Sequence, residues 1–259
     1  MPDISIRMAG TDVASLDDLL AVMKWTLSRF DQAGDNRSAF LRVYCTMTGA
    51  VKDQMRTGFF LDPAWVERVA IRFAWWYFDA LERFDRNDEA PPAWAYAFAV
   101  ARDKQAFLLQ DILMGMNAHI NNDLPLVVAA ILREEGDEAT PGRQQRRRFD
   151  HDQINRVLHQ VIPTVEREVA RHYGRLLLPL GRVMGTLDQS LSLYGLREWR
   201  DHVWQNARFL LAARHKGERD HMIRIIQADA LHVATSIERF PVLRHLRPLA
   251  PAARRWRLC

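Results

Sequence analysis

Apolar side chains recur every three to four positions along most of this chain, which is the spacing of helices with one buried face. The pattern indicates helices at about 15–27, 38–55, 63–83, 150–169, 194–213 and 218–239. Asp62 and Pro63 form a clear start signal, because aspartate caps a helix and proline fits its first position. Alternating runs joined by a two-residue turn are not evident, so we expect no β-hairpin.

The segment 110–124, which reads QDILMGMNAHINNDL, places polar side chains inside an apolar run. Apolar stretches flank it on both sides, so it should form a buried helix at the centre of the fold. We expect this helix to begin after a break near Arg102 and to end or kink at Pro125, because proline disfavours helical geometry in the preceding residue. The fold class predicted is a single all-α domain, a bundle of about eight helices around this central one.

Charge and proline set the expected limits of that domain. Residues 133–148 are rich in charge and contain Pro141 and Gly142, which predicts an exposed loop. Prolines after residue 240 predict a basic, irregular tail at 241–259, leaving a core at about 12–240 of the single domain 1–259. The net charge of +4 comes largely from arginines at 143–148 and 244–257, which we interpret as a solvated loop and tail.

Composition narrows the partners and the compartment. A recognition motif for nucleic acid does not accompany the basic clusters, so we do not expect nucleic-acid binding. Cys45 and Cys259 form neither a disulfide framework nor a zinc pattern, which fits a reducing compartment. The sequence pattern shows neither an apolar leader nor an apolar run of membrane-spanning length, so we expect a cytoplasmic protein that does not bind a membrane. The sequence is compatible with an oligomer as well as with a monomer.

His119 and Asp123 are the leading candidates for chemistry. On a helix these positions lie about 40° apart, so imidazole and carboxylate share one face. Such a pair can be an acid/base dyad, two ligands of one divalent metal ion with Asp150 as a third, or a buried hydrogen-bonded pair. Asn117 and Asn121 point to the opposite side of the same helix.

Other polar and aromatic residues complete the set of candidates. The aromatic run at 73–78 either packs as core or, through Trp75, Trp76 and Tyr77, lines a pocket. Arg200 lies on an apolar stripe and needs either a carboxylate, from Asp123 or Asp150, or a bound anion.

Familiar catalytic motifs give no further support. Glu218 and His221 form the single E-x-x-H unit of the chain, whereas a di-iron bundle needs two, so helix capping explains it better. A P-loop, a dinucleotide fingerprint and a G-x-S-x-G elbow are not found, so we expect no nucleotide cofactor.

Four linked motifs carry a family resemblance: D-P-A-W from Asp62, G-M-N-A-H-I-N-N-D-L from Gly115, D-x-x-x-I-N from Asp150 and R-D-H-V-W-Q-N-A from Arg200. Over about 36–212 the chain resembles a bacterial and fungal family of unknown function with the signature N-A-H-I-N-x-D-L. The resemblance implies one shared constellation, made of Asn117, His119, Asn121, Asp123, Asp150, Asn155, Arg200 and Trp204.

The chain also departs from that family's usual pattern. Trp75 stands where asparagine is expected, Asp111 where histidine is frequent and His151 where phenylalanine is usual. These departures suggest a specialised member with its own substrate, for example in a biosynthetic pathway.

Together these features predict a small-molecule enzyme that catalyses a cyclisation, isomerisation or elimination, with acid/base or metal assistance. His119 and Asp123 would be catalytic in an aromatic-walled internal pocket. The substrate, an apolar or cationic molecule, would be bound by Asn117, Asn121, Asn155, Trp75, Trp76, Tyr77, Met116, Arg200 and Trp204. The alternative is a non-catalytic ligand-binding or scaffold protein whose buried polar cluster is structural.

Overall fold

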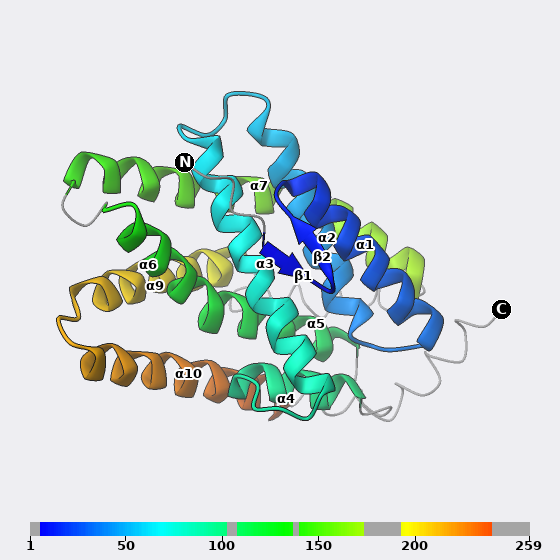
Figure 1. Ribbon diagram of the computed structural model, residues 1–259. Helices are drawn as coiled ribbons and strands as arrows, with labels where there is room; N and C mark the ends of the chain where they lie inside the picture. Colours follow the sequence, from blue (N-terminus) through cyan, green and yellow to red (C-terminus); the bar gives the residue numbers. More distant parts are fainter. Residues whose placement is uncertain (1–5, 103–107, 137–139, 174–192, 240–259) are drawn as a thin grey trace.

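The computed structural model describes residues 6–102, 108–136, 140–173 and 193–239. The predicted all-α multi-helix bundle is confirmed in these ranges (Figure 1). Its helices are α1 (Leu16–Ala33), α2 (Ser38–Met55), α3 (Pro63–Asp85), α4 (Pro92–Arg102), α5 (Leu108–Asn117), η1 (Ala118–Asp123), α6 (Leu124–Glu134), α7 (Pro141–Tyr173), α9 (Leu193–Ala212) and α10 (Lys216–Arg239). None of the described helices is both long and apolar enough to cross a membrane.

Helix starts follow the capping residues seen in the sequence. Ser15 accepts a hydrogen bond from the backbone of Asp18, whose carboxylate bonds back to the backbone N–H of Ser15, so the two form a capping box at α1. At α3 the carboxylate of Asp62 accepts from the backbone N–H of Trp65 at 2.9 Å, and Pro63 occupies the first turn. The N-terminus of α3 is therefore fixed by its own sequence.

A short β-hairpin precedes α1, contrary to expectation. Strands β1 (Ile6–Met8) and β2 (Thr11–Val13) pair antiparallel, with Met8 opposite Thr11. The two connecting residues, Ala9 and Gly10, have φ of 47° and 83°, which is typical of a tight hairpin turn. The strands are too short to show clear alternation, and only Gly10 marked the turn.

The predicted central helix is confirmed as a continuous rod of α5, η1 and α6 that contacts α2, α3, α4, α9 and α10. It does not end at Pro125. Instead, the rod widens into the π-helical turn η1, in which the backbone N–H of Leu124 bonds the carbonyl of His119 five residues earlier. Proline has no N–H to donate, so the helix absorbs Pro125 at the start of α6 by changing its hydrogen-bond spacing.

The exposed loop predicted at 133–148 is wrong for most of its length, because α7 already begins at Pro141. Proline at a first helical position is a start signal, and here it had been interpreted as a loop signal. Arg147 is buried and pairs with Asp62 and Glu135, while Arg148 pairs with Asp152 and Asp201. These two arginines therefore join helices rather than coat a loop. The predicted tail at 241–259 lies outside the described residues.

Two large apolar clusters flank the central rod in the described part of the chain, and a smaller third cluster lies among α2, α5 and α7. Of the two large clusters, one lies among α1, α2, α3, α4 and α5, with the hairpin against it, and the other among α3, α6, α7, α9 and α10. Figure 1 shows α3 crossing the face of the bundle and α10 running along one edge. The rod therefore presents its polar turn η1 between the two clusters, where side chains from several helices converge.

Gly115 provides a test of this packing. A Cβ built there would lie 2.5 Å from Cγ and 2.8 Å from Cβ of Phe40, a buried ring between α2 and the rod. We expect Gly115→Ala to lower the free energy of unfolding in urea by about 1–3 kcal/mol, because the ring must move within a filled core. In the matched control Gly49→Ala, the added Cβ meets nothing within 4 Å, so helix propensity should make it neutral or stabilising. Equal effects of the two substitutions would contradict the packing described.

Candidate functional site

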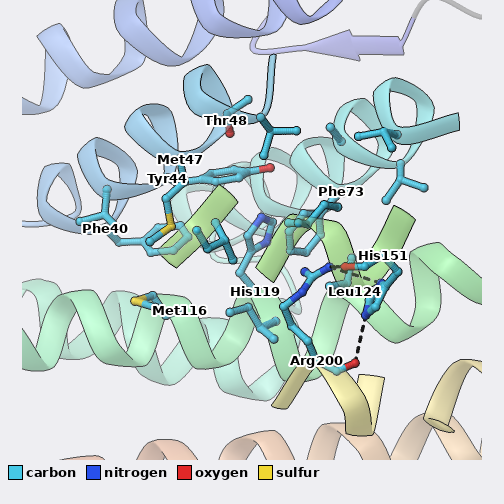
Figure 2. Close-up of a pocket in the computed structure, with 18 of the residues that line it drawn as sticks. Phe40, Tyr44, Met47, Thr48, Phe73, Met116, His119, Leu124, His151 and Arg200 are labelled. Carbon is cyan, nitrogen blue, oxygen red and sulfur yellow. Dashed lines mark hydrogen bonds between the residues drawn. The ribbon is translucent and has the colours of Figure 1, made fainter. Parts of the chain in front are cut away.

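A cavity of about 100 Å³ lies beside η1 (Figure 2). Its walls come from α2, α3, α7 and α9 and from the central rod, and most of the lining side chains are apolar. The polar side chains among the described lining residues are Thr48, His119, His151 and Arg200, together with the polar tips of Tyr44 and Trp65. The cavity therefore brings polar groups from five separate helical segments into an apolar space.

Asp123 is the most heavily bonded side chain of the polar cluster. Its Oδ2 accepts a hydrogen bond from Nε1 of Trp94 at 2.8 Å and lies 3.1 Å from Nδ1 of His119. Its Oδ1 accepts from Nδ2 of Asn122 at 2.7 Å. Asp123 and Asn122 are completely buried and His119 is nearly so, which confirms that the two predicted partners lie together.

Burial shifts the pKa values of Asp123 and His119 in opposite directions. It raises the pKa of Asp123 to about 8, against the hydrogen bonds from Asn122 and Trp94, and it lowers the pKa of His119 well below its usual value. At neutral pH both groups are therefore largely uncharged. A protonated Asp123 donates to Nδ1 of His119, which places the imidazole proton on Nε2. When the pair loses one proton, the Nε2 proton leaves, the proton of Asp123 passes to Nδ1, and Nε2 becomes an acceptor.

The imidazole of His119 is held rigidly by rings around it. Phe73 stacks on it with 3.4 Å between centroids and 7° between planes, and Tyr44 meets it edge-on at 4.4 Å. His119 is a lining residue of the cavity, and its Nε2 is buried and has no hydrogen-bond partner among the described residues. A buried imidazole nitrogen without a partner costs stability unless a ligand or water completes it.

Arg200 and His151 form a second polar unit on the cavity wall. Nη2 of Arg200 donates to the backbone carbonyl of His151 at 2.8 Å and lies 3.3 Å from its Nδ1. Nε2 of His151 donates to the carbonyl of Arg200 at 3.0 Å, so His151 is the neutral tautomer with its proton on Nε2. Burial, helped by the charge of Arg200, lowers the pKa of His151. Burial also lowers the pKa of Arg200 to about 10, which leaves it protonated at neutral pH.

The carboxylates expected to neutralise Arg200 bond elsewhere. Asp123 is bonded to Trp94, Asn122 and His119, and the carboxylate oxygens of Asp150 accept from the backbone N–H groups of Leu61 and Asp62 at 2.7 and 2.8 Å. Asp150 thus anchors the start of α3 from within α7. The salt bridge proposed for Arg200 is not formed within the described part of the chain.

The three residues predicted to form an aromatic wall, Trp75, Trp76 and Tyr77, are not among the described lining residues of the cavity. Tyr77 is fully buried against Trp94, with ring centroids 5.3 Å apart, and Trp75 and Trp76 pack at the margins of the two apolar clusters. The wall that α3 contributes comes instead from its first half, with Trp65 and Phe73. The aromatic residues at 73–78 lie on every face of α3, so the sequence alone does not show which turn of the helix borders the cavity.

The asparagines predicted to bind substrate have mainly structural roles. Asn117 donates to the carbonyl of Ala230 at 2.7 Å and accepts from Asn121 at 2.9 Å, which ties the central rod to α10. Asn155, with a buried Oδ1 lacking a partner, and Trp204, whose ring lies 5.4 Å from that of His151, are not among the described lining residues. Met116 is a lining residue, as predicted.

The donors proposed for a metal ion do not converge in the described residues. Asp150 is occupied by two backbone N–H groups, and groups of three or more His, Cys, Asp or Glu side chains with metal-binding geometry are not found there. Glu218, from the E-x-x-H unit, accepts from the backbone N–H of Arg214 at 2.9 Å, in agreement with a capping role.

Sequence reasoning missed Phe40, Tyr44, Trp65, Phe73 and His151 as cavity residues. Trp65 and Phe73 stand within or beside the motifs of the family resemblance, and His151 is one of the departures from it. No motif marks Phe40 and Tyr44 as cavity residues, because their spacing on α2 is the ordinary spacing of core residues.

The family model that matches the chain covers residues 16–239, and the chain therefore belongs to the family of unknown function DUF5995. This range extends beyond the 36–212 suggested by the motifs. Comparisons with curated proteins and with solved structures gave no match.

The raised pKa of Asp123 predicts a pH-dependent stability. Between about pH 4 and pH 8 the folded protein retains the Asp123 proton that the unfolded chain loses, so the free energy of unfolding should fall as the pH rises through this range. Asp123→Asn cannot ionise, so its stability relative to wild type should improve from pH 4 to pH 8 in urea titrations. His119 acts in the opposite sense at acid pH in both proteins, so its effect largely cancels in the comparison. A constant difference would show that Asp123 is ionised throughout.

Asp150 offers a test of the metal hypothesis. Asp150→Asn loses one of two buried backbone acceptors and should lower the free energy of unfolding by about 1–3 kcal/mol. Because the carboxylate acts on the backbone, the loss should be the same with added Zn²⁺, Mg²⁺ or Mn²⁺ and with a chelator. Metal-dependent stability in wild type that disappears in Asp150→Asn would instead support a metal site.

Proposed function

We propose that the protein is an enzyme that acts on a small, mostly apolar molecule by acid/base chemistry at His119. The observation that carries this proposal is Nε2 of His119, a buried nitrogen without a partner on the wall of an otherwise apolar cavity. Nδ1 of the same ring is held by Asp123, which is itself held by Trp94 and Asn122. An oriented imidazole with one free nitrogen is the arrangement that proton transfer needs.

Asp123 allows the imidazole of His119 to act both as a general acid and as a general base. With Asp123 protonated, Nε2 carries a proton that it can deliver to a bound molecule, and Asp123 then returns its own proton to Nδ1. With Asp123 ionised, Nε2 can remove a proton. Reactions that move a proton between two atoms of one substrate, such as isomerisation, elimination or cyclisation, fit a dyad that works in both directions.

The size of the cavity limits the substrate. A cavity of ~150 Å³ in another protein accommodates benzene, so a space of about 100 Å³ here suits a molecule of similar size, with roughly five to seven non-hydrogen atoms. Ordinary ligand pockets are roughly 300–1,000 Å³. We therefore propose a short aliphatic substrate rather than a polycyclic or nucleotide-linked one.

A non-catalytic ligand-binding protein is the second candidate. It is favoured by the hydrogen bonds of Asn117 with Ala230 and Asn121, which use part of the polar cluster to join helices. In that case His119 would bind a ligand atom but transfer no proton. Proton exchange distinguishes the two candidates, since only the enzyme moves hydrogen between ligand and solvent.

His119→Gln tests the acid/base role. Wild type and variant are incubated in D₂O with a panel of short ketones, alkenoic acids and hydroxy acids, and deuterium incorporation or isomer formation is followed by NMR. We expect wild type to accelerate exchange in at least one compound, and His119→Gln to lose about 10²–10⁴-fold of that rate. His159→Gln, an exposed histidine on α7, is the matched control and should keep it.

Equal rates in wild type and His119→Gln would contradict the acid/base role. Binding of panel compounds without any exchange in wild type would favour the binding protein instead.

A further inference from the structure

Arg200 is a buried cation whose hydrogen-bond partners in the described part of the chain are neutral. Its side chain is 4% exposed, and its hydrogen bonds go to the carbonyl and the Nδ1 of His151. Its Nε has no hydrogen-bond partner in the described part of the chain. Asp152 and Asp201 interact with its charge, but both are hydrogen-bonded to Arg148 and neither bonds the guanidinium group of Arg200. A buried cation without a directly bonded anion is costly, so Arg200 can still bind a further negative group.

Two further polar atoms without partners are nitrogens of lining residues of the same cavity. Nε1 of Trp65 can only donate a hydrogen bond, and Nε2 of His119 is a donor whenever Asp123 holds its proton. Figure 2 shows Arg200 and His119 extending toward the same space from different helices. The partnerless groups of this wall are therefore donors, and they leave room for a molecule that supplies acceptors.

Acidic side chains do not take part in the described lining of the cavity. A cationic ligand would thus meet the charge of Arg200 without a carboxylate in the lining to bind it, since the nearby Asp152 and Asp201 pair with Arg148. The aromatic rings of Phe73 and Tyr44 could attract a cation through their faces, but Phe73 already stacks on His119 and Tyr44 meets the same ring. The electrostatics of the wall favour a negative ligand over the cationic one expected from the aromatic composition.

We propose that the ligand of this cavity is a short aliphatic carboxylate whose charged end is bound by Arg200, with its apolar part against the walls of α2 and α3. The inference rests on the proposed function, because it names the substrate class of the same site. One guanidinium balances one negative charge, which favours a monoanion over a phosphate ester. The apolar lining matches a hydrocarbon remainder.

Three probes of matched shape test this charge preference. Isovalerate, isovaleramide and 3-methylbutylammonium share a branched hydrocarbon end and carry a negative, neutral and positive group. Their dissociation constants for the full-length wild-type protein are measured by calorimetry at pH 7 and low ionic strength. We expect isovalerate to bind at least about tenfold more tightly than either of the others, since a desolvated charge pair is formed only by the anion.

Variants of Arg200 assign the preference to its charge. Arg200→Gln should reduce the preference of isovalerate over isovaleramide to about onefold, whereas Arg200→Lys should keep part of it because the charge remains. Arg208→Gln, an exposed arginine on the same helix, should leave the preference unchanged. If Arg200→Gln does not fold, the three probes on wild type still decide.

Isovaleramide or the ammonium binding as tightly as isovalerate would overturn the inference, as would a preference that survives in Arg200→Gln. Failure of all three probes to bind folded wild type would overturn it as well. The acid/base proposal fails separately, through equal hydrogen exchange in wild type and His119→Gln, so the two failures are distinguishable.

Discussion

The hydrogen bonds of Asp123 hold the centre of this protein together. One buried carboxyl group accepts from Trp94 on α4, accepts from Asn122 on its own turn and lies against Nδ1 of His119. A buried polar group left without these partners would cost about 1–3 kcal/mol or more. The position of α4, the shape of η1 and the orientation of the imidazole therefore depend on the same side chain. A function at His119 and the stability of the core cannot be separated at this residue.

The π-helical turn explains how a single helix can carry this cluster. A regular α-helix would repeat its hydrogen bonds every four residues, but Leu124 bonds back five residues to His119 and Pro125 donates none. The widened turn keeps His119 and Asp123 in contact on one side, while Asn117 on the preceding turn faces α10. Pro125, where the helix was expected to end or kink, marks where the helix changes its hydrogen-bond spacing and presents its polar side chains.

Local and periodic features of the fold could be predicted from the sequence, and long-range ones could not. The caps at Ser15 and Asp62 act within one helical turn, so their residues are sufficient to identify them. The contact between His119 and Asp123 is also local, at one turn of the central rod. The cavity wall, by contrast, depends on which turn of α3 passes η1. The aromatic run gives the same apolar pattern at Phe73 and at Tyr77, and only packing places one at the cavity and the other in the core.

The pairing of Arg200 with His151 joins the fold to the inferred chemistry. The main contact of Arg200 is a backbone carbonyl, which any residue at position 151 would supply, so the backbone places the guanidinium group. The ring of His151 adds a second, weaker acceptor and donates back to the carbonyl of Arg200, which fixes its tautomer. Phenylalanine, the usual residue there in the family resemblance, would offer neither contact. The histidine of this chain therefore holds the cation in place without adding a negative charge of its own.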